Sequence, residues 1–381
     1  MIYFDNSATT PLCAGAKQEM SRAIGNFGNP SSLHAAGQSA AQILNTARAQ
    51  IGAALDARKD KFEIVFTSGG TEGNNLALFG VLNAKNYKNP KIITSDSEHP
   101  CVLEPCKVLE AQGVRVVRLR TVGGKLDEEQ FDAEMDGDVC LVSLMHVNNE
   151  TGAVYPVGRF FEKAKAKSPQ VICHTDAVQA FLKIPLSMRS LGADLVTLSA
   201  HKIGGPKGCG ALVISRDLIK RKALLPLLYG GGQMGNLRSG TENTVGIAGF
   251  GGAAEEKHAS FAENAEKTAR LRAYLAARLP DEVAVNDPPV HAPHILSLTL
   301  PNIKSETALN FFSARGICVS NGSACASNGK HKSYVLAAYG LTDKQVDSTI
   351  RVSLSAENTE KEVDEFVGAL DEALGTLVRF K

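Results

Sequence analysis

The stretch Thr197-Leu198-Ser199-Ala200-His201-Lys202-Ile203-Gly204-Gly205 places a lysine where a short apolar strand gives way to a glycine-rich turn. A lysine at such a strand end is expected to be partly desolvated. Desolvation disfavours the ammonium form and frees the amine for Schiff-base chemistry. The same local pattern also suits a solvated turn lysine, so the rest of the chain has to decide between the two.

Apolar runs recur through the first part of the chain, with helical stretches between them. Strands joined by helical crossovers form largely parallel sheets that are covered on both faces. The pattern therefore predicts an α/β fold. The expected strands span 63–67, 91–94, 114–119, 139–145, 171–174, 195–199 and 210–214, and the first expected helices span 71–82 and 100–112.

Beyond about residue 244 the pattern changes. One long helix is expected over 255–279, and the runs 295–300 and 349–354 alternate apolar and polar residues like half-exposed strands. We therefore expect two domains: a large domain of residues 16–259, and a smaller α+β domain made of residues 1–15 and 260–381.

Composition excludes several classes of function. With 381 residues and 44% hydrophobic content the chain can bury a large core. A net charge of +1 gives no electrostatic case for binding nucleic acid or a membrane surface. The eight cysteines include no Cys-x-x-Cys pair, so no metal site is expected. The start has no signal-peptide pattern, and we expect a soluble cytoplasmic protein.

Polar residues follow the expected strands at the edge where ligands of such sheets gather. They are Thr71, His99, Asn149, Asp176 and Lys202. The glycines of the segment 68–75 also allow close backbone approach, and a helix N-terminus offers free N–H groups to a phosphate. The alternative is an ordinary capped turn. Without the lysine spacing of a Walker motif, the segment does not favour a nucleoside triphosphate.

Two residues of the last third carry chemistry of their own. Cys325 lies among Gly322, Ser323 and Ala324, and small neighbours give a thiol access and mobility. We expect it to be reactive, and we expect the loop 320–332 to be the most mobile segment. Arg351 shares a strand face with serines, where it could grip a carboxylate or simply be solvated.

Taken together, the separated motifs resemble those of cysteine desulfurases, in the class V aminotransferase-like family that depends on pyridoxal phosphate. The resemblance runs nearly end to end and rests on the segments 3–11, 29–32, 68–75, 145–152, 197–208, 237–241 and 322–327. It implies the aspartate-aminotransferase-like (type I) fold, whose large domain has a mostly parallel seven-stranded sheet, beside a smaller α+β domain.

The resemblance also implies a role for each site residue. Lys202 should form the Schiff base with pyridoxal 5′-phosphate and move the Cα proton, Asp176 should hold the ring nitrogen protonated, and His99 should stack on the ring. Arg351 should bind the substrate carboxylate, and Asn149 should help to place both the cofactor ring and the substrate. The residues expected to bond the ring oxygen or the phosphate are Gln179, Gly70, Thr71, Ser199, His201 and, toward the partner subunit of a homodimer, Thr241.

The implied reaction converts L-cysteine to L-alanine, with Cys325 taking the sulfur as a persulfide. The acceptor would be a protein such as an iron–sulfur scaffold or a tRNA-thiolation protein. Two alternatives stay open. One is another class V enzyme, an aminotransferase or a cysteine or selenocysteine lyase, that needs no thiol. The other is a non-catalytic sulfur carrier or scaffold with the same fold.

Overall fold

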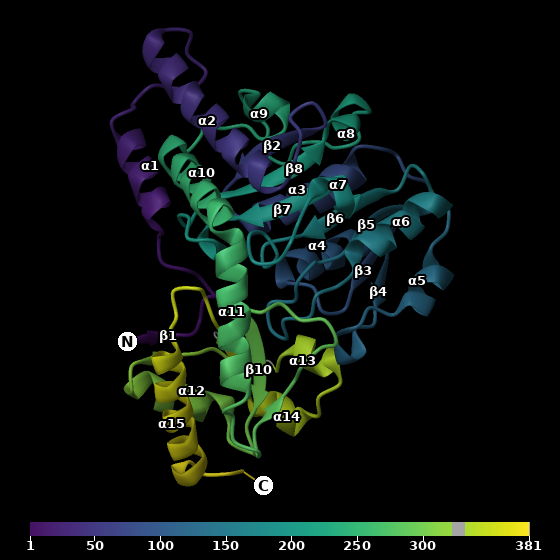
Figure 1. Cartoon of the computed structure of the whole chain (residues 1–381). Helices are drawn as coiled ribbons and strands as arrows, with labels where there is room; N and C mark the ends of the chain where they lie inside the picture. Colours follow the sequence, from purple (N-terminus) through teal and green to yellow (C-terminus); the bar gives the residue numbers. More distant parts are fainter. Residues whose placement is uncertain (322–331, 381) are drawn as a thin grey trace.

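A seven-stranded sheet forms the centre of the computed structural model, which describes residues 1–321 and 332–380 (Figure 1). Its strands run in the order β2-β8-β7-β6-β5-β3-β4. Only β8 runs against its neighbours, so the prediction of a mostly parallel sheet is confirmed. The strands are β2 (Phe62–Thr67), β3 (Lys91–Ser95), β4 (Arg115–Leu119), β5 (Val139–Ser143), β6 (Ile172–Asp176), β7 (Leu195–Ser199) and β8 (Gly210–Ser215).

Helices connect these strands and pack around the sheet (Figure 1). The two predicted near the start of the series are present as α3 (Gly70–Asn83) and α4 (Pro100–Ala111). The others in this part of the chain are α1 (Ala14–Ile24), α2 (Ala35–Ala54), η1 (Val122–Gly124), α5 (Glu128–Glu134), α6 (Val157–Lys167), α7 (Met188–Leu191), η2 (Ala200–Lys202), α8 (Arg216–Lys220), α9 (Gln233–Asn236) and α10 (Thr244–Ala259).

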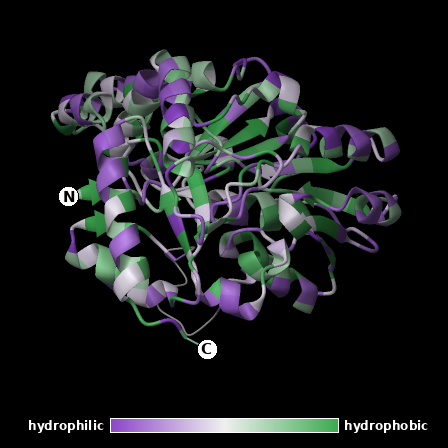
Figure 2. Cartoon of the chain, turned by 60° about the horizontal axis from the view of Figure 1, so that its bottom comes forward, coloured by the Kyte–Doolittle hydropathy of each residue, from purple (hydrophilic) through white to green (hydrophobic). Residues whose placement is uncertain are grey.

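The main hydrophobic core lies on both faces of this sheet. Every residue of β3, β5, β6 and β7 is buried, as expected for the central strands of a parallel sheet that is covered on both faces. Figure 2 shows the hydrophobic residues concentrated on the strands in the middle of the molecule.

A second hydrophobic core gathers the last third of the chain and its first residues. Strand β10 (Ile295–Thr299) pairs antiparallel with β9 (Ala284–Val285) and β12 (Thr349–Ser353), while β1 (Ile2–Tyr3) pairs with β11 (Ile317–Cys318). Both chain ends lie beside this core (Figure 1). The precise domain boundaries stay a prediction. The helices here are α11 (Phe261–Ala276), α12 (Ser305–Ala314), α13 (Tyr334–Tyr339), α14 (Asp343–Asp347) and α15 (Glu360–Thr376).

The prediction of one long helix over 255–279 is wrong. The chain forms α10 and α11 instead, with a break at Ser260. The backbone N–H and the hydroxyl of Ser260 both donate to the carbonyl of Glu256. A serine hydroxyl that bonds the carbonyl four residues before it weakens a helix and often bends it.

The prediction of half-exposed strands at 295–300 and 349–354 is also wrong, because β10 and β12 are buried along their whole length. Their polar side chains pair with each other and with nearby segments. Thr299 bonds Thr349 across the two strands at 2.8 Å, and Asn286 donates to Ser297 at 3.0 Å. The polar face of this small sheet is therefore covered by protein rather than by water.

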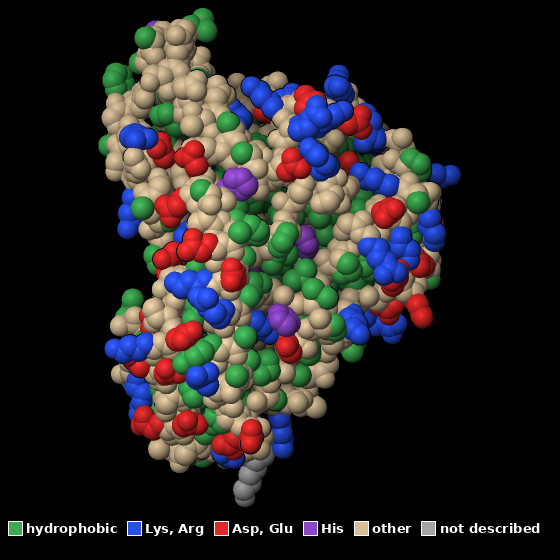
Figure 3. Space-filling model, viewed as in Figure 1, with side chains coloured by type: hydrophobic (Ala, Val, Ile, Leu, Met, Phe, Trp, Pro, Cys, Tyr) green, Lys and Arg blue, Asp and Glu red, His purple; other side chains and the backbone are tan. Residues whose placement is uncertain are grey.

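Charges are mixed on the molecular surface. On the face shown in Figure 3, acidic and basic side chains are interspersed, in agreement with the net charge of +1. Among the described residues, no helix is long and apolar enough to cross a membrane.

The second core predicts a large cost for truncating Phe366. Its ring is fully buried, 5.7 Å from that of Phe4 and 5.3 Å from that of Phe312. Phe366→Ala should lower the free energy of unfolding by about 3–5 kcal/mol, because contacts are lost and a cavity is left. Urea unfolding measures this, with Val378→Ala at an exposed position as the control. Equal stabilities of the two variants would show that this cluster is not a core.

Candidate active site

One cavity of about 200 Å³ collects most of the predicted site residues. It lies at the carboxyl ends of β6 and β7, where ligands of parallel sheets bind. Sequence reasoning gave no site role to Ser7, Ala8, Cys101 and Met145, which also line it. The predicted residues in its wall are Gly70, Thr71, His99, Asn149, Asp176, Gln179, Ser199, His201, Lys202 and Arg351.

Lys202 ends the short η2 turn that follows β7. Its amine donates to the backbone carbonyls of Ser7 at 2.6 Å and Ala8 at 2.8 Å. The N-terminal segment is held there by Thr10, whose N–H and hydroxyl both donate to the carbonyl of His201. The amine that the sequence singled out is thus aimed into the cavity by a segment about 190 residues away.

Asp176, the last residue of β6, brings a carboxylate to the cavity and is only 6% exposed. The side-chain amide of Asn74 donates to one of its oxygens at 2.6 Å, and the N–H of Val178 donates to the other at 2.9 Å. These two donors fix the orientation of the carboxylate. Because each oxygen has two lone pairs, Asp176 can still accept a bond from a ligand.

His99 begins α4 as its N-cap residue and reaches the same cavity. Its Nδ1 accepts from the N–H of Cys101 at 3.2 Å. Burial lowers the pKa of His99, the Lys202 charge adds to this, and Asp176 opposes it. The imidazole is therefore a neutral, flat surface near neutral pH.

Arg351 on β12 closes the cavity from the second core and is 2% exposed. It donates to the carbonyl of Asn149 and to the carboxylate of Asp5, both at 2.8 Å. Among the described residues its buried Nε–H has no partner. The sequence left open a solvated arginine, and the structure excludes it.

A cradle for an anion forms where α3 begins. Gly69 caps this helix without a side-chain hydrogen bond, so the first backbone N–H groups are available to a ligand. A methyl group at Gly70 would lie 2.9 Å from Val178, which shows how closely the backbone packs. His201 stands opposite, and burial lowers its pKa to about 4, so its neutral ring can donate one N–H.

Gln179 lies between Lys183 and the N-terminal segment. Lys183 donates to its side-chain oxygen, and its side-chain N–H₂ donates to the carbonyl of Ser7, both at 2.9 Å. Because an ammonium can only donate, Lys183 dictates which end of the amide is the oxygen. The N–H₂ end is thereby directed to the cavity side.

Two predicted residues do not line the cavity. Thr241 is exposed and lies outside it. Cys325 falls within 322–331, outside the described residues, and so does most of the loop predicted to be mobile.

Glu98 is a site neighbour that sequence reasoning missed. It is fully buried beside His99, and burial raises its pKa from 4.5 to about 8. One oxygen accepts from the Ser95 hydroxyl and the Met145 N–H, both at 2.8 Å. Among the described residues the other oxygen has no partner, as fits a carboxyl that keeps its proton at neutral pH.

Glu98 should make stability fall as pH rises. The folded protein holds this proton more tightly than the unfolded chain, so the stability it gives is complete below pH 4.5 and is lost as pH rises through about 8. Relative to Glu98→Gln, the wild type should lose about 1.4 kcal/mol per pH unit in that window. Urea unfolding across the window measures this, with exposed Glu104→Gln as the control. A constant difference between the wild type and Glu98→Gln would mean that Glu98 is ionised.

Comparison with known proteins places the chain in a family. Residues 2–366 match the model of the family Aminotransferase class-V. The chain is 39% identical to a cysteine desulfurase of Trichormus azollae, covering 99% of this chain and 94% of that protein. It is also 39% identical to the cysteine desulfurase IscS of Proteus mirabilis, covering 99% and 93%. A solved NifS-like protein superposes with a TM-score of 0.91 at 35% identity, covering 99% and 100%. The chain belongs to the aminotransferase class-V family, whose enzymes of this kind depend on pyridoxal phosphate.

Proposed function

We propose that this chain is a cysteine desulfurase. It converts L-cysteine to L-alanine and passes the sulfur, as a persulfide on Cys325, to an acceptor that serves iron–sulfur cluster or thio-cofactor synthesis. One observation carries the proposal. The amine of Lys202, the carboxylate of Asp176 and the guanidinium of Arg351 face one cavity, as a pyridoxal-phosphate enzyme acting on an amino acid requires.

The residues in the cavity fit pyridoxal phosphate. The N–H groups at the start of α3, with Ser199 and His201, suit the phosphate, and Asp176 has the lone pairs to hold a protonated ring nitrogen. His99 offers its flat neutral ring for stacking, and Gln179 offers an N–H for the ring oxygen. Lys202 supplies the amine that attaches the cofactor. Once bound, pyridoxal phosphate supplies an electron sink for the bonds around the substrate Cα.

Substrate recognition falls to Arg351 and Asn149. A guanidinium binds a carboxylate through paired N–H groups, and the unpartnered Nε–H of Arg351 is one such donor. Because Arg351 is held by Asn149 and Asp5, its side chain is already oriented before a substrate arrives. Lys202 then carries the Cα proton, since its amine lies in the same cavity.

The sulfur step needs a nucleophilic thiolate. The Cys325 thiolate forms an S–S bond to the substrate sulfur while the Cβ–S bond breaks. The electron pair of the broken bond stays with the Cβ side, which takes up protons to complete alanine. The persulfide left on Cys325 carries the sulfur onward.

The functional unit is a homodimer in this proposal, with Thr241 reaching the phosphate of the partner subunit. Its support is that Thr241 is exposed and does not line the cavity of its own subunit. Large apolar side chains are also exposed near the α1–α2 connection, at Ile24, Phe27 and Leu33, as is typical of a surface that another protein covers.

In this proposal the enzyme works in the cytoplasm, and the acceptor of its sulfur is a protein.

Replacement of Lys202 tests the role of the amine. Lys202→Ala should lower alanine formation from cysteine by roughly 10²–10⁴-fold, because both the attachment point and the proton carrier are removed. The matched control is Lys207→Ala, an exposed lysine of the same turn. Turnover of Lys202→Ala near the wild-type rate would show that the Lys202 amine does not have this role.

Replacement of Cys325 separates the desulfurase from its alternatives. Cys325→Ala should bind cofactor normally yet lose alanine and sulfide production under reductant, because no thiol remains to accept sulfur. Cys318→Ala, a half-buried cysteine on β11, is the control. If Cys325→Ala kept full production, the enzyme would be a lyase that needs no thiol. A wild-type protein that bound no cofactor would instead be a carrier.

A further inference from the structure

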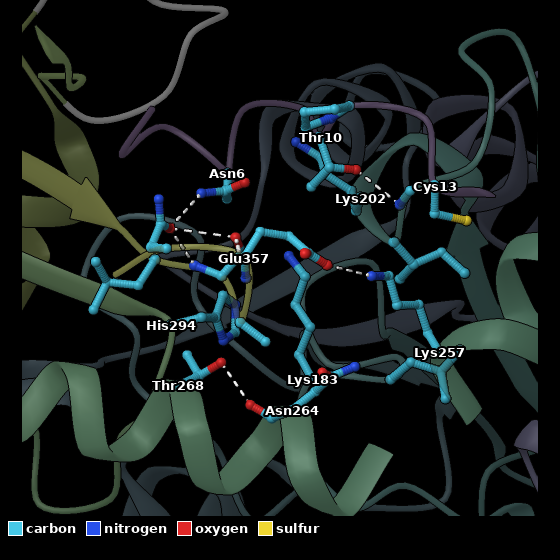
Figure 4. Close-up of a pocket in the computed structure, with 18 of the residues that line it drawn as sticks. Asn6, Thr10, Cys13, Lys183, Lys202, Lys257, Asn264, Thr268, His294 and Glu357 are labelled. Carbon is cyan, nitrogen blue, oxygen red and sulfur yellow. Dashed lines mark hydrogen bonds and ion pairs between the residues drawn. The ribbon is translucent and has the colours of Figure 1, made fainter. Parts of the chain in front are cut away.

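A second, larger cavity of about 560 Å³ lies between the two hydrophobic cores. It is bordered by the N-terminal segment, by α11 and by the chain just before α15 (Figure 4). It shares only Lys202 with the cavity described above, so it is a separate compartment. Its volume and its place between packed units are typical of a small-molecule site.

Not every charged side chain in this cavity is paired with an opposite charge. All three carboxylates in its wall are engaged: Glu256 accepts from Gly15 N–H, Glu357 pairs with Lys257 at 3.0 Å, and Glu362 caps α15. Lys183 is different. Among the described residues its ammonium has one partner, the neutral oxygen of Gln179. Two of its three donors are therefore left for a ligand.

His294 is a second polar group without a partner. It lines the cavity, is 4% exposed, and has no hydrogen-bond partner for either ring nitrogen in the described part of the chain. Burial lowers its pKa, and the nearby charge of Lys183 adds to the effect. Burial and the charges of Lys202 and Arg351 likewise lower the pKa of Lys183. Buried polar groups are normally bonded, so an anion is the complement that this environment lacks.

We propose that this cavity binds a small aliphatic carboxylate. The ammonium of Lys183 and one ring N–H of His294 take the carboxylate oxygens. The hydrocarbon part contacts the apolar wall, which includes Pro11, Leu12, Leu182, Ile203, Leu354 and Ala356. Because Lys183 also donates to Gln179, which lines the cofactor cavity, a single side chain links the bound carboxylate to that cavity.

Calorimetric titration of the holoenzyme with butyrate tests this proposal, with butyramide as the neutral isostere. Butyrate should bind, and butyramide should bind at least about tenfold more weakly, since it lacks the charge that Lys183 pairs with. Lys183→Met and His294→Gln should each weaken butyrate binding by about tenfold or more. The matched control is Lys267→Met, a lysine of α11 that does not line the cavity.

Arg351→Met separates this site from the substrate site, because Arg351 could also pair with butyrate. We expect this variant to keep its affinity for butyrate. Loss of binding in Arg351→Met together with retention in Lys183→Met would place butyrate in the substrate site and overturn it. Equal affinity for butyrate and butyramide, or no binding of butyrate, would also overturn it. Circular dichroism checks that each variant is folded. If Lys183→Met does not fold, the affinity of His294→Gln for butyrate tests the proposal alone.

Discussion

Arg351 is a guanidinium buried to 2% exposure, and a buried cation has to be paired. Its partners come from two distant parts of the chain, the Asn149 carbonyl after β5 and the Asp5 carboxylate in the N-terminal segment. The strand that carries Arg351 belongs to the second core. One side chain therefore joins three segments, and their junction forms a wall of the active-site cavity.

The same junction brings the N-terminal segment to η2, the turn that carries Lys202. Phe4 is anchored in the second core beside Phe366, and three residues later Ser7 accepts from both Lys202 and Gln179. Packing of the second core and placement of the reactive amine are thus mechanically linked. A rigid arrangement of this kind suits catalysis, because a reacting group must be held in position.

Burial also determines which side chains around the cavity are neutral. Burial lowers the pKa of His99 and His201 and raises that of Glu98, so these groups are neutral near neutral pH. The charged chemistry is left to Asp176, Lys202 and Arg351. A few charges in a low-dielectric site interact more strongly than they would in water.

The sequence predicted what depends on local pattern. Apolar runs, or alternation in the case of 114–119, identified all seven central strands, and residues at strand ends identified Asp176 and Lys202. It missed what depends on contacts between distant or unpredicted side chains, such as the hydrogen bonds from Asn74 to Asp176 and from Lys183 to Gln179. The small sheet looked half-exposed because alternation cannot tell a polar face covered by protein from one covered by water. The break at Ser260 was missed because the residues around it are good helix formers.

The sulfur transfer to Cys325 can be followed by mass spectrometry of the protein after brief incubation with L-cysteine. We expect the added mass of one sulfur atom on the peptide that contains Cys325, with one alanine formed for each sulfur transferred. Pyruvate and ammonia as products, with no added sulfur on that peptide, would contradict it.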